Sequence, residues 1–168
     1  MFRSFPYLYD GDFDYEAHYL RSYRDTPRGV LVVAKDGNRI VGAATGMPLR
    51  DHGDAAQMDT SLLPPVPEIF YFAESVLLPM YRGQGIGHKF FDLREAHARG
   101  YGFAHALFCG VTRPASHPMR PAGYRPLDAF WSKRGYAPVP GATAVFHWKD
   151  LGQTEETPHT LQCWMNHL

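Results

Sequence analysis

The sequence has few of the residues that define several large classes of protein. It has only two cysteines in 168 residues, Cys109 and Cys163, far apart along the chain. That usage is typical of free thiols in a reducing cytoplasm and does not suggest a disulfide framework. The nine histidines form no His-x-x-x-His pair, and no Cys-x-x-Cys occurs. We therefore expect a cytoplasmic protein without a metal site.

Long apolar runs and an excess of one charge are also missing. No apolar segment approaches the ~20 residues that cross a bilayer, and Met1–Pro6 lacks the apolar core of a signal peptide. The 17 Lys and Arg residues balance 17 Asp and Glu residues, so nothing points to bulk binding of nucleic acid or an anionic membrane. We expect neither partner, and the length suits a single domain over residues 1–168.

A glycine-rich segment is the most informative feature that is present. Residues 78–87 read Leu-Pro-Met-Tyr-Arg-Gly-Gln-Gly-Ile-Gly, between an apolar run over 69–77 and a helical pattern over 88–99. Because glycines lack side chains, their backbone N–H groups can approach an anion closely, and the start of a helix adds partial positive charge. The segment predicts a phosphate-binding turn between a strand and a helix.

The spacing of these glycines excludes two common phosphate-binding motifs. A Gly-x-Gly-x-x-Gly fingerprint that starts at Gly83 needs a third glycine where the chain has His88. A P-loop needs a lysine followed by serine or threonine, and neither pair follows here. The pattern that remains is Arg82-x-x-Gly85-x-Gly87.

The rest of the chain predicts a mixed α/β order. Since a strand, a helix and a strand follow one another around the glycine turn, the two strands should lie parallel. The expected elements are a helix over 13–24, a hairpin of strands 30–34 and 39–47, a loop over 49–67, a central strand over 68–78, a helix over 88–99, a strand over 104–109, a short helix over 127–134, a strand over 142–148, a polar loop over 149–159 and a strand over 161–164.

Periodicity predicts which helical faces point inward. In the first helix Tyr15, Tyr19 and Tyr23 recur at every fourth position. In the helix after the glycines, Ile86, Phe90, Leu93 and His97 mark one face. We expect both faces to pack against the sheet.

The pattern Arg82-x-x-Gly85-x-Gly87 resembles the pyrophosphate loop of the GNAT (Gcn5-related N-acetyltransferase) superfamily, which reads Gln/Arg-x-x-Gly-x-Gly/Ala. The preceding residues 76–79 resemble the acetyl-CoA strand of that family, and residues 113–136 look like a bacterial subgroup of it. The resemblance covers residues 13–168. It implies an α/β fold with a mixed central sheet of about six strands, helices on both faces, and the first family strand missing. It also implies a splay between the central strand and its parallel neighbour, with the cofactor in the gap.

The resemblance implies an acetyl-CoA-dependent N-acetyltransferase. Such an enzyme passes an acetyl group to a primary amine of a small molecule or peptide by direct attack in a ternary complex. Two alternatives stay open, a non-catalytic acyl-CoA-binding or regulatory domain and an O-acyltransferase. Because members of the family are often dimers, a homodimer is the expected assembly.

The resemblance also assigns residues to the acetyl-CoA. The backbone of Val76, Leu77 and Leu78 would pair with the pantetheine arm, and an N–H near Leu77 or Leu78 would donate to the oxyanion. Trp131 stands where the family usually has tyrosine and would pack against the same arm. The pyrophosphate would lie on Arg82, Gly83, Gln84, Gly85, Ile86, Gly87, His88 and Lys89, with Lys89 either a cofactor contact or a solvated helix residue.

Glu74 is the candidate general base. It lies among apolar residues of the expected central strand, and strand alternation places it on the same face as Phe72 and Val76. A carboxylate in such surroundings is costly unless it is used or paired. The resemblance implies proton abstraction, commonly through water, and the alternative is a carboxylate paired with a nearby arginine or tyrosine.

The acid that protonates the departing thiolate is left open. Trp131 occupies the position of the usual tyrosine, and an indole N–H is a poor proton donor. Tyr136, Tyr124 and His117 are the candidates, although Tyr136 is also suited to be the aromatic plug that ends the short helix.

Two further groups carry alternatives. Arg113, His117, Arg120 and Arg125 form a basic loop that binds an anionic acceptor, binds the 3′-phosphate of CoA, or is merely solvated. Cys109 is either an acylated nucleophile or, as we expect, a small buried residue, because no histidine or aspartate is spaced to activate it.

Overall fold

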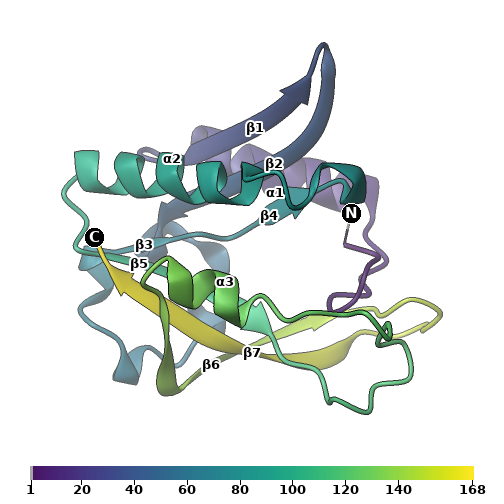
Figure 1. Ribbon diagram of the computed structural model, residues 1–168. Helices are drawn as coiled ribbons and strands as arrows, with labels where there is room; N and C mark the ends of the chain where they lie inside the picture. Colours follow the sequence, from purple (N-terminus) through teal and green to yellow (C-terminus); the bar gives the residue numbers. More distant parts are fainter. Residues whose placement is uncertain (1) are drawn as a thin grey trace.

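The elements of the fold follow the predicted order. A computed structural model describes residues 2–168, apart from the side chains of Tyr15 and Asp54. Figure 1 shows a mixed sheet with helices on both faces. The elements are α1 Phe13–Asp25, β1 Val30–Asp36, β2 Arg39–Pro48, β3 Ile69–Tyr71, β4 Ser75–Leu77, α2 Ile86–Gly100, β5 His105–Val111, α3 Asp128–Lys133, β6 Ala137–Trp148 and β7 Thr157–His167, with four short 3-10 helices between residues 49 and 68.

The sheet confirms the predicted fold class. Within the described residues it has seven strands in the order β1-β2-β3-β5-β7-β6, with β4 paired to β2 beside this path. Strands β3 and β5 run parallel, and the other pairs are antiparallel. Since β3 and β4 are two halves of the expected central strand, the count agrees with about six strands.

Strand β1 is the outer strand at one side of the sheet. It pairs with β2 through the predicted turn, where Gly37 has a φ of 56°. The segment before α1, residues 2–12, consists mainly of turns, with an isolated bridge from Tyr9 to Asp150. The described residues therefore do not include the first strand of the GNAT pattern.

The two faces of the sheet carry different cover. Helices α2 and α3 lie in front of it in Figure 1, and α1 lies behind. On the front face Phe70, Phe72, Phe91 and Phe108 form one core cluster. On the rear face Tyr71 belongs to a second cluster, which includes residues of the segment after β2. Both clusters share the central strands, which fixes the sheet between two packed layers.

The buried face of α2 differs from the predicted one. Leu93, expected in the core, is 53% exposed. The buried residues are Phe90, Phe91, Arg94, Glu95 and Ala98, so the inward face includes two charged residues that periodicity of apolar residues does not detect. In α1, Tyr23 is buried as predicted, whereas the prediction for Tyr15 falls outside the described side chains.

The C-terminal hairpin is longer than predicted. Strand β6 already begins at Ala137, with an irregular register between Pro138 and Thr143, where Gly141 has a φ of 78°. Strand β7 begins at Thr157, since polar residues at its exposed end pair with the end of β6. The expected loop over 149–159 is correspondingly shorter.

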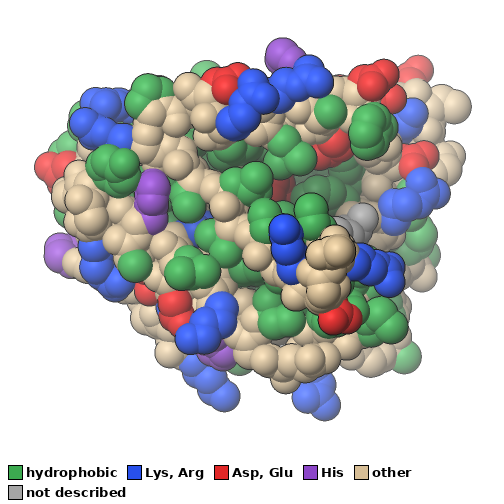
Figure 2. Space-filling view, turned by 90° about the horizontal axis from the view of Figure 1, so that it is seen from above, with side chains coloured by type: hydrophobic (Ala, Val, Ile, Leu, Met, Phe, Trp, Pro, Cys, Tyr) green, Lys and Arg blue, Asp and Glu red, His purple; other side chains and the backbone are tan. Residues whose placement is uncertain are grey.

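The surface seen from above carries both signs of charge. Figure 2 shows Lys and Arg side chains interspersed with Asp, Glu and hydrophobic side chains on this face. This pattern agrees with the zero formal charge of the chain. Among the described residues, no helix combines the length and apolar character needed to cross a membrane.

Candidate active site

The central strand is broken where Glu74 lies. Strand β3 pairs with β5, but residues 72–74 leave the strand pattern, and β4 then pairs with β2. The prediction of one continuous strand over 68–78 is wrong for this reason. Beyond the break β4 diverges from β5, as Figure 1 shows, which confirms the expected splay.

Arg94 of α2 holds this break in place. Its guanidinium donates to the carbonyls of Thr45 (3.1 Å) and Glu74 (3.2 Å) and to the hydroxyl of Ser75 (2.9 Å), and it lies 4.3 Å from the ring centre of Phe72. Burial lowers the pKa of Arg94 to about 10, which leaves it charged at neutral pH. Arg94 thus ties backbone groups of β2 and of the break to α2, in addition to the backbone hydrogen bond between Thr45 and Glu74.

The splay opens a cleft on the front face, which we name the front cleft. Its volume is about 1120 Å³, and its walls come from β4, β5, α2, α3, the glycine turn and residues 2–7. Of the predicted cofactor residues, those that line it are Val76, Leu77, Arg82, Gly83, Gly85, Gly87, His88 and Trp131. The four others, Leu78, Gln84, Ile86 and Lys89, are not part of its lining among the described residues.

The backbone of β4 directs the N–H groups of Ser75 and Leu77 away from β2. The N–H of Leu78 donates to the carbonyl of Val41 (2.9 Å), and that of Thr45 donates to the carbonyl of Glu74 (3.0 Å). Because backbone groups alternate in direction along a strand, residue 76 also faces β2, and Leu77 directs its N–H away from β2. Leu78 is therefore not available as the oxyanion donor, since its N–H is already used.

The glycine turn has the geometry that its sequence predicts. Gly83 and Gly85 have φ values of 75° and 81°, a region costly for residues with a side chain. Gly85 caps α2, so the N–H groups of residues 85–88 lack partners within the helix. The Arg82 guanidinium donates to the carbonyl of Leu77 (3.1 Å) and so joins the turn to β4. Four N–H groups at a helix start form an anion site.

Two predicted residues of this turn point elsewhere. The amide of Gln84 donates to the carbonyl of Met80 (2.9 Å). The ammonium of Lys89 lies 3.9 Å from Asp92, and its side chain is 78% exposed. This position agrees with the alternative in which Lys89 is a solvated helix residue.

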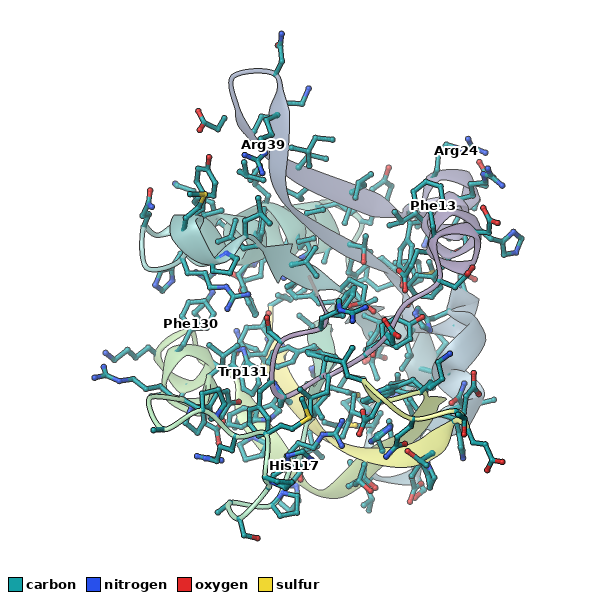
Figure 3. The ribbon with its side chains drawn as sticks, turned by 90° about the vertical axis from the view of Figure 1, so that its right-hand side faces the viewer. Phe13, Arg24, Arg39, His117, Phe130 and Trp131 are labelled. Atoms are coloured by element: carbon teal, nitrogen blue, oxygen red, sulfur yellow. The ribbon has the colours of Figure 1, made fainter. Side chains whose placement is uncertain are left out.

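Trp131 forms part of the wall opposite β4. Its ring centre lies 4.9 Å from that of Phe108 and 5.1 Å from that of Trp164. A Cβ atom at Gly110 would approach the Trp131 ring to 2.8 Å, so glycine is needed there for this packing. In Figure 3 Trp131 lies on α3, below the N-terminal segment that crosses between the two halves of the molecule.

Tyr136 lies outside the front cleft. It is 2% exposed, and its hydroxyl donates to Glu95 (3.2 Å). Burial raises the pKa of Tyr136, and the negative charge of Glu95 raises it further. A hydroxyl already engaged in the core does not reach the reacting atoms, so the geometry gives Tyr136 the aromatic-plug role and does not support it as the acid.

Glu74 faces a second space, which we name the rear cavity. This cavity of about 720 Å³ is lined by α1, the N-terminal segment, the end of β3 and the β6–β7 connection. Phe72 instead packs against Phe91 of α2, with ring centres 5.8 Å apart. The expected common face of Glu74, Phe72 and Val76 is therefore wrong, because the break at residues 72–74 interrupts the alternation.

Tyr7 lies where the two spaces meet. Phe2, Tyr7, Ala73 and Cys109 line both the front cleft and the rear cavity. Desolvation raises the pKa of Tyr7, and the negative charge of Glu74 raises it further, so its hydroxyl keeps its proton at neutral pH. Sequence reasoning missed Tyr7, since the irregular N-terminal segment carries no motif that marks it.

Arg113 fixes the N-terminal segment. It donates to both carboxylate oxygens of Asp150 (2.9 and 2.7 Å) and to the carbonyls of Pro6 (2.9 Å) and Tyr7 (3.0 Å). The two charged side chains are only 9% and 12% exposed. The expectation that Arg113 binds an anionic acceptor or the CoA 3′-phosphate is therefore wrong, because its guanidinium is already occupied.

The rest of the basic loop lies along the front cleft. Arg120 and Arg125 are both in its lining. The Arg120 guanidinium lies 4.9 Å from the ring centre of Tyr124, and His117 packs beside Phe5 with ring centres 5.6 Å apart. Two of the predicted cations therefore remain available to phosphates.

The two cysteines lie opposite each other on β5 and β7. Both thiols are free and buried, and their sulfur atoms are 3.4 Å apart. The hydrogen bond with Cys163 raises the pKa of Cys109, and burial raises it further. A thiol held protonated is a weak nucleophile, which agrees with the expected packing role. The described residues contain no cluster of metal ligands.

The family model described as Acetyltransferase (GNAT) family matches residues 2–122. The comparison with curated sequences returned no significant match.

Solved structures share the fold at low sequence identity. A ribosomal-protein-alanine N-acetyltransferase from Brucella melitensis has a TM-score of 0.58 and 16% identity, covering 94% of this chain and 80% of its own. A GNAT family acetyltransferase from Elizabethkingia anophelis with acetyl-CoA bound has a TM-score of 0.55 and 15% identity, covering 96% and 86%. A Kribbella flavida GCN5-related N-acetyltransferase has a TM-score of 0.58 and 16% identity, covering 94% and 79%. Together with the family match over most of the chain, the splayed strands and the glycine turn, this shows that the chain belongs to the acetyltransferase (GNAT) family.

Proposed function

We propose that this protein is an acetyl-CoA-dependent N-acetyltransferase that acts on a primary amine. One observation carries the proposal. At the break at residues 72–74 the front cleft, with its glycine turn, opens on one side of the strand, and the side chain of Glu74 faces the rear cavity on the other. The two spaces meet at Tyr7, Ala73 and Cys109. A thioester that enters from the front and an amine that enters from the rear would react at that junction.

The front cleft suits acetyl-CoA in both size and charge. The pyrophosphate would lie on the N–H groups of the glycine turn, near Arg82, with Arg120 and Arg125 available to further phosphate. The pantetheine arm would run along the backbone of β4, between this strand and the wall of Trp131. The Elizabethkingia neighbour is described with acetyl-CoA bound, which supports the same co-substrate here.

The chemistry that we propose is direct attack by the amine on the thioester. Amines carry a proton at neutral pH, so the Glu74 carboxylate would first accept that proton through water and release it to solvent. The neutral amine would then attack, and its nitrogen would lose a second proton to Glu74 through the same water once the C–N bond has formed. The N–H of Leu77 would donate to the oxyanion on the thioester carbon. When the intermediate collapses and the C–S bond breaks, the thiolate of CoA needs a proton. We assign that proton to the Tyr7 hydroxyl, with Tyr124 as the alternative; the phenolate then regains a proton from solvent.

Thiol release tests this proposal. The protein is mixed with acetyl-CoA and a panel of primary amines, free thiol is measured over time, and acetylated product is identified by mass. We expect thiol release that depends on both protein and amine. Binding of CoA with no transfer to any amine would favour the non-catalytic alternative, to which Trp131 at the usual tyrosine position lends weight. If calorimetry detects no CoA binding, the assignment of the front cleft fails.

A further inference from the structure

The rear cavity has walls of an unusual composition. Aromatic rings line much of it: Phe2, Tyr7, Tyr9, Tyr19, Tyr71, Phe146 and Trp148. His52 lies among them, 4.7 Å from the ring centre of Tyr71 and in contact with the hydroxyl groups of Tyr19 (3.2 Å) and Tyr23 (2.9 Å). The volume of about 720 Å³ falls within the range of small-molecule sites. A small molecule with apolar parts fits these walls.

The charges on the cavity are mainly negative. Its lining contains five carboxylates, at Asp10, Asp12, Glu16, Glu74 and Glu156, against a single ammonium at Lys149. Asp10 forms an ion pair with Arg3, which removes it from the balance. The carboxylates that remain come from three separate parts of the chain: the entry to α1, the central-strand break and the β6–β7 connection. Aromatic faces and carboxylates together favour a cationic ligand.

The front cleft shows the opposite sign. Its lining contains Arg82, Arg94, Arg120 and Arg125 against Asp128, once Arg113 is left out because it is paired with Asp150. The two spaces share Phe2, Tyr7, Ala73 and Cys109 in their walls, so the two sides of this junction favour opposite charges on a ligand. A ligand that carries a carboxylate would be repelled from the rear and attracted to the front.

We propose that the acceptor is an amine with a second positive charge. This inference rests on the proposed function and names the substrate class of the same site. The reacting amine lies at Glu74, and the second cation lies between the aromatic walls and the carboxylates of Glu16 and Glu156. Glu74 serves the reaction, and the other carboxylates bind the charge that does not react. An amine that carries an anionic group in place of the second cation is disfavoured, because that group would lie beside these carboxylates.

Three probes of equal chain length separate these cases: cadaverine, pentylamine and aminovalerate. They carry at the far end an ammonium, a methyl group and a carboxylate. We expect kcat/KM to fall about tenfold from cadaverine to pentylamine and again from pentylamine to aminovalerate. The advantage of cadaverine over pentylamine should shrink as the salt concentration rises.

Variants test which carboxylates bind the second charge. Glu156→Gln and Glu16→Gln should each lower kcat/KM for cadaverine about fivefold more than for pentylamine. Glu155→Gln is the matched control, since its carboxylate is adjacent in sequence and outside the lining of the cavity. We expect the control to keep the wild-type preference.

The outcomes distinguish this inference from the proposed function. Transfer to pentylamine or aminovalerate as fast as to cadaverine overturns the dicationic acceptor and leaves the acetyltransferase intact. If no probe is acetylated, calorimetry of cadaverine against the CoA-loaded protein decides: binding that weakens in Glu156→Gln supports the site, and no binding overturns it. Failure of CoA itself to bind counts against the proposed function alone.

Discussion

The front cleft and the rear cavity are built by different means from the same strand. The front cleft depends on backbone: the N–H groups of residues 85–88, the exposed edge of Leu77 and two glycines with positive φ. The rear cavity depends on side chains that converge from residues 2–19, 52–74 and 146–161 and from Cys109 of β5. A few consecutive backbone groups suit a phosphate group, which every CoA ester carries. Side chains from distant segments, in contrast, suit the recognition of one particular acceptor.

The strand break couples these two regions. Arg94 reaches from α2 to the carbonyl of Glu74 and the hydroxyl of Ser75. The same residue therefore positions the rear-facing base and the start of the front-facing edge. Variants of the rear cavity should therefore change acceptor turnover or stability, whereas variants of the front cleft should change CoA affinity.

The largest effect is expected at the clamp of the N-terminal segment. Arg113→Met should lower the free energy of unfolding by about 3 kcal/mol, because it leaves the carboxylate of Asp150 buried without its partner. Denaturant titration measures the loss. Arg125→Met is the control, since Arg125 is exposed, and should change stability little. A small loss in Arg113→Met would mean that the rear side does not depend on this ion pair.

Removal of the base should separate chemistry from cofactor binding. Glu74→Gln is expected to lower turnover about 10²-fold with acetyl-CoA affinity nearly unchanged, because the amide cannot accept the proton and lies outside the front cleft. Steady-state rates and calorimetry measure the two quantities. Glu68→Gln, which changes an exposed carboxylate immediately before β3, is the control. Unchanged turnover of a true acceptor would remove Glu74 from the mechanism.

A change in the glycine turn should have the converse effect. Gly85→Ala places a side chain at a φ of 81° and should weaken CoA binding about tenfold by distorting the N–H cradle. Gly102→Ala is a close control, because Gly102 has a φ of 78° and open space around it beyond the far end of α2. Equal loss of CoA affinity in both variants would mean that strain, and not the cradle, is responsible.

The sequence predicts the front cleft better than the rear cavity, because the first is built from consecutive residues and the second from distant ones. The glycine turn and its helix follow from ten consecutive residues, so local physics determines them. The break at residues 72–74 does not, because its apolar pattern is that of an unbroken strand and the stabilising Arg94 lies twenty positions later. Tyr7 and the Arg113–Asp150 pair depend on contacts between distant segments, which no local pattern encodes.

The smallest predicted effect is a pH dependence of the rear side. Burial lowers the pKa of His159, which stacks on Trp148 at 3.8 Å between ring centres. Since its folded pKa lies below the unfolded value near 6.5, the unfolded chain gains a proton first as the pH falls, and stability is lost below that value. Burial alone would raise the pKa of Asp150, but Arg113 lowers it overall, so this carboxylate adds a second loss below about pH 4.

Unfolding free energies measured from pH 8 to pH 3 test both groups. His159→Asn should flatten the first decline and Asp150→Asn the second, whereas His18→Asn on the exposed side of α1 serves as the control. His159 stacks on Trp148, and Asp150 is paired with the Arg113 that binds the carbonyl of Tyr7. Because Trp148 and Tyr7 both line the rear cavity, mild acid should weaken acceptor binding before it weakens CoA binding. If both affinities fall together, the two regions respond to pH as one unit. That result would contradict the proposal that the front cleft binds CoA and the rear cavity binds the acceptor independently.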